Sequence, residues 1–156
     1  MRDKRFITKH RGGPLKEDLH RQLIKWACHC TEHVLSLYVG EVDERVKNAI
    51  LVAKAWETGR ASVGDARKSA LGAIAVANEA SSPIVVAIAR SAGHAVASAH
   101  MADHCLGAAL YALKAVKYSG KSIEAERKWQ NEQLPVEIME LVLDTRSKKE
   151  AFSNIQ

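Results

Sequence analysis

Alanine dominates the middle of this chain and constrains what it can fold into. It fills 21 of the 67 positions from Ala49 to Ala115, and alanine has the highest intrinsic helix propensity of all residues. Strand signals are nearly absent, because aromatic residues make up only 5% of the chain and no Asn-Gly or Asp-Gly pair joins alternating segments. The sequence therefore predicts an all-α fold, a compact bundle or short array of about six to seven antiparallel helices around an alanine-rich core.

Capping residues and apolar periodicity set the expected helix boundaries. The expected helices are a stripe from Leu19 to Leu37, a segment from Val42 to Thr58, a segment capped by Ser62 or Asp65, a segment from Pro83 to Tyr118, and two further helices that start at Ser122 and Pro135. We expect the fourth helix to break near Ser98–Ala102, because unbroken it would measure about 54 Å in a domain only about 40 Å across. The third helix carries mostly alanine on its inward side, which predicts a central position.

The basic charge of the chain is confined to one end. Lys and Arg number 23 against 18 Asp and Glu, and residues 1–25 contain 8 of those bases but only 3 of the acids. We therefore divide the chain into a basic flexible N-terminal arm over residues 1–14, a single all-helical domain over 15–146 and a polar C-terminal tail over 147–156. The arm could touch phosphates, with Phe6 as a stacking side chain, but a short solvated charge run is the simpler interpretation, so nucleic acid is not the expected partner.

The sequence favours a cytoplasmic protein. The basic N-terminus is followed by Gly12, Gly13 and Pro14 instead of the apolar segment of a signal peptide. The three cysteines are an odd number and do not resemble a secreted disulfide framework. Within residues 69–116 the charge-free runs reach 12 residues at most, which is shorter than the roughly 18 to 20 residues that span a bilayer. We therefore expect no membrane segment, while the formation of a homo-oligomer stays open.

Two histidine pairs are candidates for metal binding. His100 and His104 stand four residues apart, as do His29 and His33, and residues four apart share a helix face where two imidazoles can hold zinc or a similar divalent metal. Asp103, or a residue from a facing helix, could supply a third ligand. Zinc proteases need a glutamate directly after the first histidine, whereas Glu32 lies directly before His33 and the His100 pair encloses no glutamate. Neither pair has the glutamate three residues before a histidine that di-iron bundles use. Packing histidines are therefore the simpler interpretation, and no cofactor is expected.

The cysteines do not form a recognisable redox or metal motif. Cys28 and Cys30 are two residues apart, which places their side chains about 200° apart around a helix axis. Cys30 lies in the apolar stripe and is expected in the core, whereas Cys28 is expected as an exposed thiol. Phosphate loops, nucleophile elbows and catalytic carboxylate pairs are also missing from the sequence. An enzyme is thus the less favoured interpretation, and Gly93 and Gly107 are best explained by close helix crossings.

Three segments of the chain together resemble a known family. They are residues 54–67, residues 92–112, and Trp129-Gln130 with Leu134-Pro135. This combination resembles the immunity-five-like family of bacterial immunity proteins over roughly residues 19–142. The resemblance implies an all-helical binding protein that neutralises a cognate toxin by direct protein–protein contact, and it assigns no catalytic residue. Inhibitors of nuclease toxins tend to be acidic, so the neutral helical body favours a toxin of another kind. A metal-binding or metal-dependent helical protein that uses His100 and His104 is the alternative.

Large aromatic and histidine side chains are the candidates for a partner-binding patch or pocket. For each aromatic residue the alternative is packing in the core, because both roles bury a large apolar surface. The candidates are His94, His29, His33, Trp26, Trp56, Trp129 and Tyr111.

Overall fold

A computed structural model describes residues 2–149 and 155 of the chain. The α-helices are α1 (Glu17–His33), α2 (Glu44–Glu57), α3 (Val63–Glu79), α4 (Pro83–Ala97), α5 (His104–Tyr118), α6 (Ile123–Glu132) and α7 (Val136–Lys148). Three short 3-10 helices are η1 (Lys4–Phe6), η2 (Lys9–Arg11) and η3 (Leu35–Leu37). The described residues contain no β-strand, only an isolated bridge between Thr8 and Leu15. The predicted all-α fold of about seven helices is confirmed.

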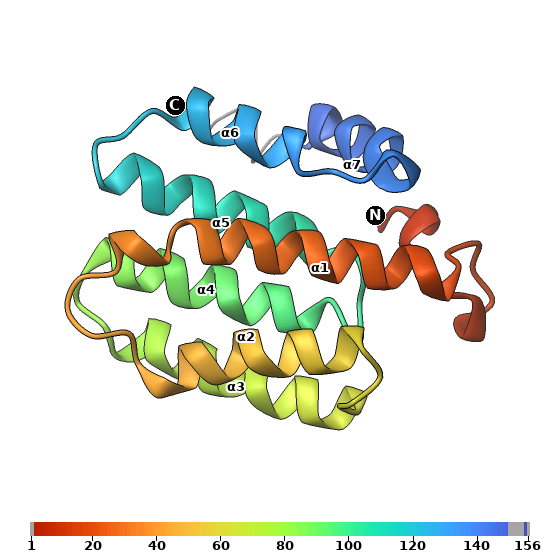
Figure 1. The fold of residues 1–156 in the computed structure, drawn as a ribbon, viewed down its shortest axis with the longest axis horizontal. Helices are drawn as coiled ribbons and strands as arrows, with labels where there is room; N and C mark the ends of the chain where they lie inside the picture. The colour runs from red at the N-terminus through yellow and green to blue at the C-terminus, as the bar shows by residue number, and fades with distance from the viewer. Residues whose placement is uncertain (1, 150–154, 156) are drawn as a thin grey trace.

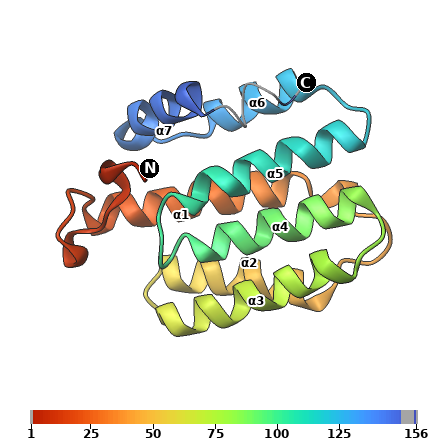
Figure 2. The ribbon, with the colours of Figure 1, turned by 180° about the vertical axis from the view of Figure 1, so that it is seen from behind.

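The first five helices form two layers. Helices α3, α4 and α5 lie side by side in one layer, and α1 and α2 pack on one of its faces (Figures 1 and 2). Helix α1 contacts both α4 and α5, and α2 contacts both α3 and α4. Helices α6 and α7 cover the edge formed by α5 and α1. In the part of the chain that the structure describes, no α-helix covers the other face of the α3–α4–α5 layer, which we call the outer face.

Helix α4 lies at the centre of this arrangement. It packs against α3 and α5 at its sides and against α1 and α2 on one face, and most of its residues are buried. Small side chains permit this close approach, since a Cβ at Gly93 would already touch Ala73 and Ile74 at 3.6 Å. The expectation that the helix capped by Ser62 or Asp65 is central is wrong, because α3 lies at the edge of the layer and its Ile74, expected to point inward, is 44% exposed. Alanine on a helix face indicates that another helix can approach that face closely, but it does not indicate how many helices pack around it.

Side-chain caps fix the helix starts that the sequence predicted. Oγ of Ser62 accepts from the backbone N–H of Asp65 at 3.0 Å, and Oδ2 of Asp65 accepts from the N–H of Ser62 at 2.9 Å. This reciprocal capping box satisfies two of the N–H groups that a helix leaves unpaired at its start. Oγ of Ser82 likewise accepts from the N–H of Val85 at 3.4 Å, with Pro83 at the first helical position.

The predicted break in the long apolar segment is confirmed, while the first helix is shorter than expected. Helix α4 ends at Ala97 and α5 begins at His104. With this break, none of the helices in the described ranges is long and apolar enough to cross a membrane. Helix α1 ends at His33, and the predicted stripe continues into η3. The tighter turns of η3 still pack Leu35 and Leu37 against the core, so the apolar spacing resembled that of one continuous helix.

Helix α1 is buried on more than one side, which corrects a cysteine prediction. Cys30 is fully buried as expected, but Cys28 is also buried, with 2% of its surface exposed. Its prediction as an exposed thiol is wrong because α1 packs against α2 as well as against α4 and α5, so the buried surface is wider than one apolar stripe. Burial raises the pKa of the Cys28 thiol to about 12. Cys105 is the third buried, unpaired cysteine.

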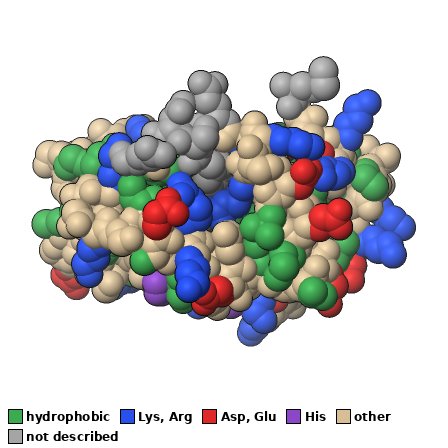
Figure 3. Space-filling view, turned by 90° about the horizontal axis from the view of Figure 1, so that it is seen from above, with side chains coloured by type: hydrophobic (Ala, Val, Ile, Leu, Met, Phe, Trp, Pro, Cys, Tyr) green, Lys and Arg blue, Asp and Glu red, His purple; other side chains and the backbone are tan. Residues whose placement is uncertain are grey.

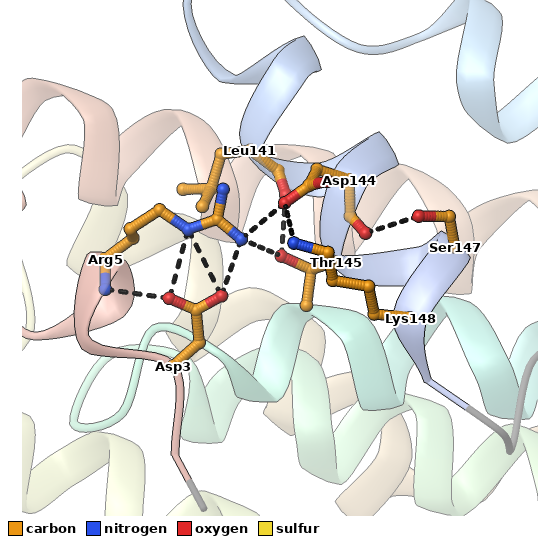
Figure 4. A network of polar contacts seen from close by, with 7 residues as sticks. All are labelled: Asp3, Arg5, Leu141, Asp144, Thr145, Ser147 and Lys148. Atoms are coloured by element: carbon orange, nitrogen blue, oxygen red, sulfur yellow. Dashed lines mark hydrogen bonds and ion pairs between the residues drawn. The ribbon is translucent and has the colours of Figure 1, made fainter.

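The N-terminal segment packs against the helical body. Phe6 is fully buried, so it is not available to stack on a nucleic-acid base. Nη2 of Arg5 donates to Oδ2 of Asp3 at 2.7 Å and lies 2.8 Å from Oδ2 of Asp144 on α7 (Figure 4). These carboxylates raise the pKa of the Arg5 guanidinium. The division into arm, domain and tail stays a prediction; residues 150–154 and 156 of the tail lie outside the described residues.

A buried polar network joins α1, α5, α6 and α7. Gln130 on α6 is fully buried; its Nε2 donates to the carbonyl of Ala109 at 3.1 Å, and its Oε1 accepts from Nη2 of Arg146 at 2.5 Å. The indole N–H of Trp26 donates to the backbone carbonyl of Gln130 at 2.9 Å. Burial lowers the pKa of Arg146 to about 10. The network thus supplies the acceptors that a buried guanidinium requires.

Replacement of Gln130 tests the importance of this network. In Gln130→Met the side chain keeps its volume but loses both hydrogen bonds, so we expect the free energy of unfolding to fall by about 2–4 kcal/mol in urea denaturation. Lys128→Met, at an exposed position of the same helix, is the control and should change it by less than about 0.5 kcal/mol. Equal stability of the two variants would contradict a structural role for Gln130.

Candidate functional site

The break between α4 and α5 assembles a histidine cluster. His94 lies in the last turn of α4 and His104 starts α5, and their Nδ1 atoms are 3.0 Å apart. One Nδ1 must therefore carry a proton and donate it to the other. His100 lies in the connecting turn, with its ring centre 5.4 Å from that of His104. The assumption that His100 and His104 share a helix face is wrong, because the chain between them is not helical.

Gly107 makes room for this pair. A Cβ at Gly107 would lie 2.5 Å from Nδ1 and 2.7 Å from Cγ of His94, well inside van der Waals contact. At Gly107, where the sequence predicted a close helix crossing, the His94 ring packs directly against α5. We call this space the seat of the His94 ring. Any larger residue would have to displace that ring from α5.

Tyr111 extends the cluster along the surface of α5. Its ring stacks on that of His94, with 5.3 Å between the ring centres and 15° between the planes. Nζ of Lys114 lies 4.8 Å from the centre of the Tyr111 ring, and Cζ of Arg90 lies 5.7 Å from it. Both distances allow cation–π attraction. An imidazole, a phenol and two cations thus form one row across α4 and α5.

A small cavity of about 260 Å³ lies beside the histidines. It is lined by His94, Met101, Asp103, His104, Leu106, Gly107, Leu110 and Lys149. Desolvation lowers the pKa of His94 to about 4, and repulsion by His104 and Arg90 adds to this effect. Desolvation also lowers the pKa values of His100 and His104. The imidazoles are therefore neutral at neutral pH, and Arg90 and Lys114 supply the charge of this surface.

The predicted metal ligands His100, His104 and Asp103 do not converge on one point. Within residues 2–149 and 155, no three His, Cys, Asp or Glu side chains are placed to hold one metal ion. Oδ2 of Asp103 instead lies 3.4 Å from Nε of Arg2. An ion bound to His104 through Nδ1 would also have to replace the contact with His94. Zinc or another divalent metal at these residues stays a prediction.

A second pair of predicted residues meets at the end of α1. The ring of His33 stacks on the indole of Trp129 from α6, with 3.5 Å between the ring centres and 6° between the planes. Nδ1 of His33 lies 2.7 Å from Oε2 of Glu126; an ionised carboxylate can only accept, so the ring donates. A groove of about 450 Å³ runs beside these side chains. The contacts hold α6 against α1.

The remaining predicted residues lie apart from both clusters. Trp26 is 1% exposed and belongs to the core. Trp56 packs on His20 with 4.6 Å between the ring centres, and Nε2 of His20 lies 2.6 Å from the carbonyl oxygen of Ser98. Trp56 thus supports the turn between α4 and α5 through His20. His29 is exposed and lines a different cavity from His33.

Sequence reasoning missed the residues that complete each cluster. Lys114 stands three residues after Tyr111, and Glu126 stands three residues before Trp129, so helical spacing was a usable signal for both. Arg90 reaches Tyr111 from another helix, and no local pattern indicates that contact.

A glycine-to-alanine pair tests the seat of the His94 ring. Gly107→Ala should displace that ring and lower the free energy of unfolding by roughly 1–3 kcal/mol. Gly93→Ala, the matched control, adds a Cβ at ordinary contact distance, so it should be neutral or stabilising by up to about 1 kcal/mol. Chemical denaturation measures both values. The seat would be refuted if Gly107→Ala were as stable as the wild type with unchanged His94 and His104 imidazole NMR signals.

The histidine cluster predicts a loss of stability in mild acid. Because the pKa of His94 is lowered from 6.5 to about 4, the unfolded chain binds the proton first. Above about pH 6.5 the protonation of His94 does not lower the free energy of unfolding. As the pH falls from there towards about 4, the free energy of unfolding decreases by up to about 3 kcal/mol because of His94. Urea denaturation between pH 7.5 and 5 should show a smaller decrease for His94→Phe than for the wild type. His29→Phe, at an exposed position, should keep the wild-type decrease; equal slopes in all three proteins would contradict the assignment.

Comparison with known proteins identifies the family of this chain. A protein-family model described as Imm-5 like putative immunity protein matches residues 13–137. The match covers α1 through α6 and therefore includes both the cluster around His94 and His104 and the stacked pair of His33 and Trp129. Searches of curated proteins and of solved structures gave no significant match. The match extends over well more than half of the 156 residues, and the chain belongs to the Imm-5 like putative immunity protein family.

Proposed function

We propose that this chain protects its own cell by binding a cognate toxin directly and blocking it. The observation that carries the proposal is family membership across residues 13–137. An immunity role requires a protein partner and a surface that holds it. The two-layer fold offers such a surface, because the outer face of α3, α4 and α5 is free of covering helices among the described residues.

Exposed apolar side chains on this layer support a protein partner. Leu71 is 68% exposed and Ile74 is 44% exposed, and both lie on α3. Exposed apolar side chains mark an interaction surface when they form one patch, and these two stand three residues apart on the same side of α3. The proposal places the complex in the cytoplasm, where the three buried, unpaired cysteines would stay reduced.

Co-expression with the toxin encoded beside this chain tests the proposed function. The chain should restore the growth of cells that produce the toxin, because a bound toxin cannot reach its target. An unrelated toxin of a different class is the control and should still kill. Size-exclusion chromatography with light scattering on an inactive toxin variant should show a complex, and it also gives the oligomeric state of the free chain. If growth is not restored and no complex forms, the chain is not an immunity protein for that toxin.

A further inference from the structure

We propose that the partner docks on the outer face of α3, α4 and α5, and that it presents acidic side chains there. This inference rests on the proposed function and names the surface and chemistry of the contact. We call the surface the basic face and define it by Arg67, Leu71 and Ile74 on α3, Arg90 and His94 on α4, and Tyr111 and Lys114 on α5.

The geometry of the layer brings these residues onto one face. Residues 67, 71 and 74 are spaced at four and three positions, so they lie along one side of α3. That side meets α4 where Ile74 lies against Gly93. Helix α4 is sunk between its neighbours, and Arg90 is its most central exposed residue. Across α4, the row of Arg90, Tyr111 and Lys114 continues the face onto α5.

None of the residues that define the basic face is acidic, and the carboxylates of α3 and of the α4–α5 segment in the described part of the chain have partners elsewhere, Asp65 with the backbone N–H of Ser62. Between Pro83 and Lys121 the sequence contains one acidic residue, Asp103, and its carboxylate is engaged by Arg2. On α3, Glu79 turns towards α2, where Nη2 of Arg45 lies 2.7 Å from its carboxylate.

The cations of the basic face are not among the Lys and Arg side chains that form ion pairs in the described part of the chain. Among the described residues, Arg67, Arg90 and Lys114 form no ion pair with a carboxylate. The surface over α6 and α7 instead carries both charges close together (Figure 3), with ion pairs such as Lys148 with Asp144 at 3.1 Å. The positive charge of the basic face is therefore available to a partner. Contact with the Tyr111 ring already limits the side-chain motion of Arg90 and Lys114.

This chemistry fits an acidic protein surface with an apolar centre. The exposed Leu71 and Ile74 would be buried by a protein contact, whereas a phosphate backbone would leave them in water. Opposite charge around such a contact accelerates association and excludes wrong partners. A nuclease whose basic cleft formed the contact would be repelled. The basic face therefore favours a toxin that contacts it through carboxylates.

Charge reversal on the basic face tests this proposal against a matched reversal elsewhere. Arg90→Glu with Lys114→Glu should weaken binding of the cognate toxin by about tenfold, mainly through a slower association that is strongly salt-dependent. Lys47→Glu with Lys128→Glu changes the net charge equally at exposed positions on α2 and α6 and should change the affinity by less than about twofold. Arg67→Glu alone should weaken binding in the same direction as the first pair. Surface plasmon resonance measures the rates, and circular dichroism confirms the fold.

Each outcome distinguishes this proposal from the proposed function. Equal affinities of both reversed pairs for the toxin would overturn the docking face but leave the immunity role intact. Failure of the wild-type chain to bind the toxin would overturn both. Wild-type binding to duplex DNA, an RNA hairpin or phosphatidylglycerol vesicles that is lost in Arg90→Glu with Lys114→Glu would assign the face to nucleic acid or membrane instead. Folded Leu71→Ser with weakened toxin binding would support the apolar contact, since serine keeps the charge unchanged.

Discussion

The close packing of α4 between α3 and α5 is the constraint on which the rest of the structure depends. Alanine and glycine on the facing sides allow the helices to approach until a single Cβ at Gly93 would make contact. Because α4 is sunk in the layer, α1 and α2 can cover one side of it while Arg90 and His94 emerge on the other. The same small residues provide the space at Gly107 that holds the His94 ring. The small side chains around α4 thus account both for its dense packing and for the exposure of Arg90 and His94 on the outer face.

The fold also changes the meaning of the chain's basic character. In the sequence the excess of positive charge belongs to the first 25 residues, but Arg2 and Arg5 are paired with Asp103 and Asp144 in the structure. Ion pairs of exposed side chains contribute little stability, yet they remove these cations from the free charge of the surface. Positive charge without an ion-pair partner among the described residues also lies on α4 and α5, around Tyr111. A partner can therefore meet positive charge on the helical body as well as on the N-terminal segment.

Features that depend on local chemistry could be predicted from the sequence, and features that depend on the number of neighbours could not. The cap at Ser62 and the break after Ala97 follow from residues close in the chain and from helix length. The burial of Cys28 depends on a second helix packed on α1, which periodicity alone does not reveal. For the same reason the contact between His94 and His104 was not predicted, although both residues were candidates. Tertiary packing selected His94, not His100, as the partner of His104.

Hydroxyl-radical footprinting of the chain alone and in complex with its cognate toxin tests the central claim most directly. Side chains that a partner covers are oxidised more slowly. If the toxin docks on the outer face, Tyr111 and Leu71 will be protected in the complex. Trp129 on α6 and the 77%-exposed Val136 on α7 will react as in the free chain. Protection of Trp129 and Val136 with unchanged oxidation of Tyr111 and Leu71 would contradict the docking of the partner on α3, α4 and α5.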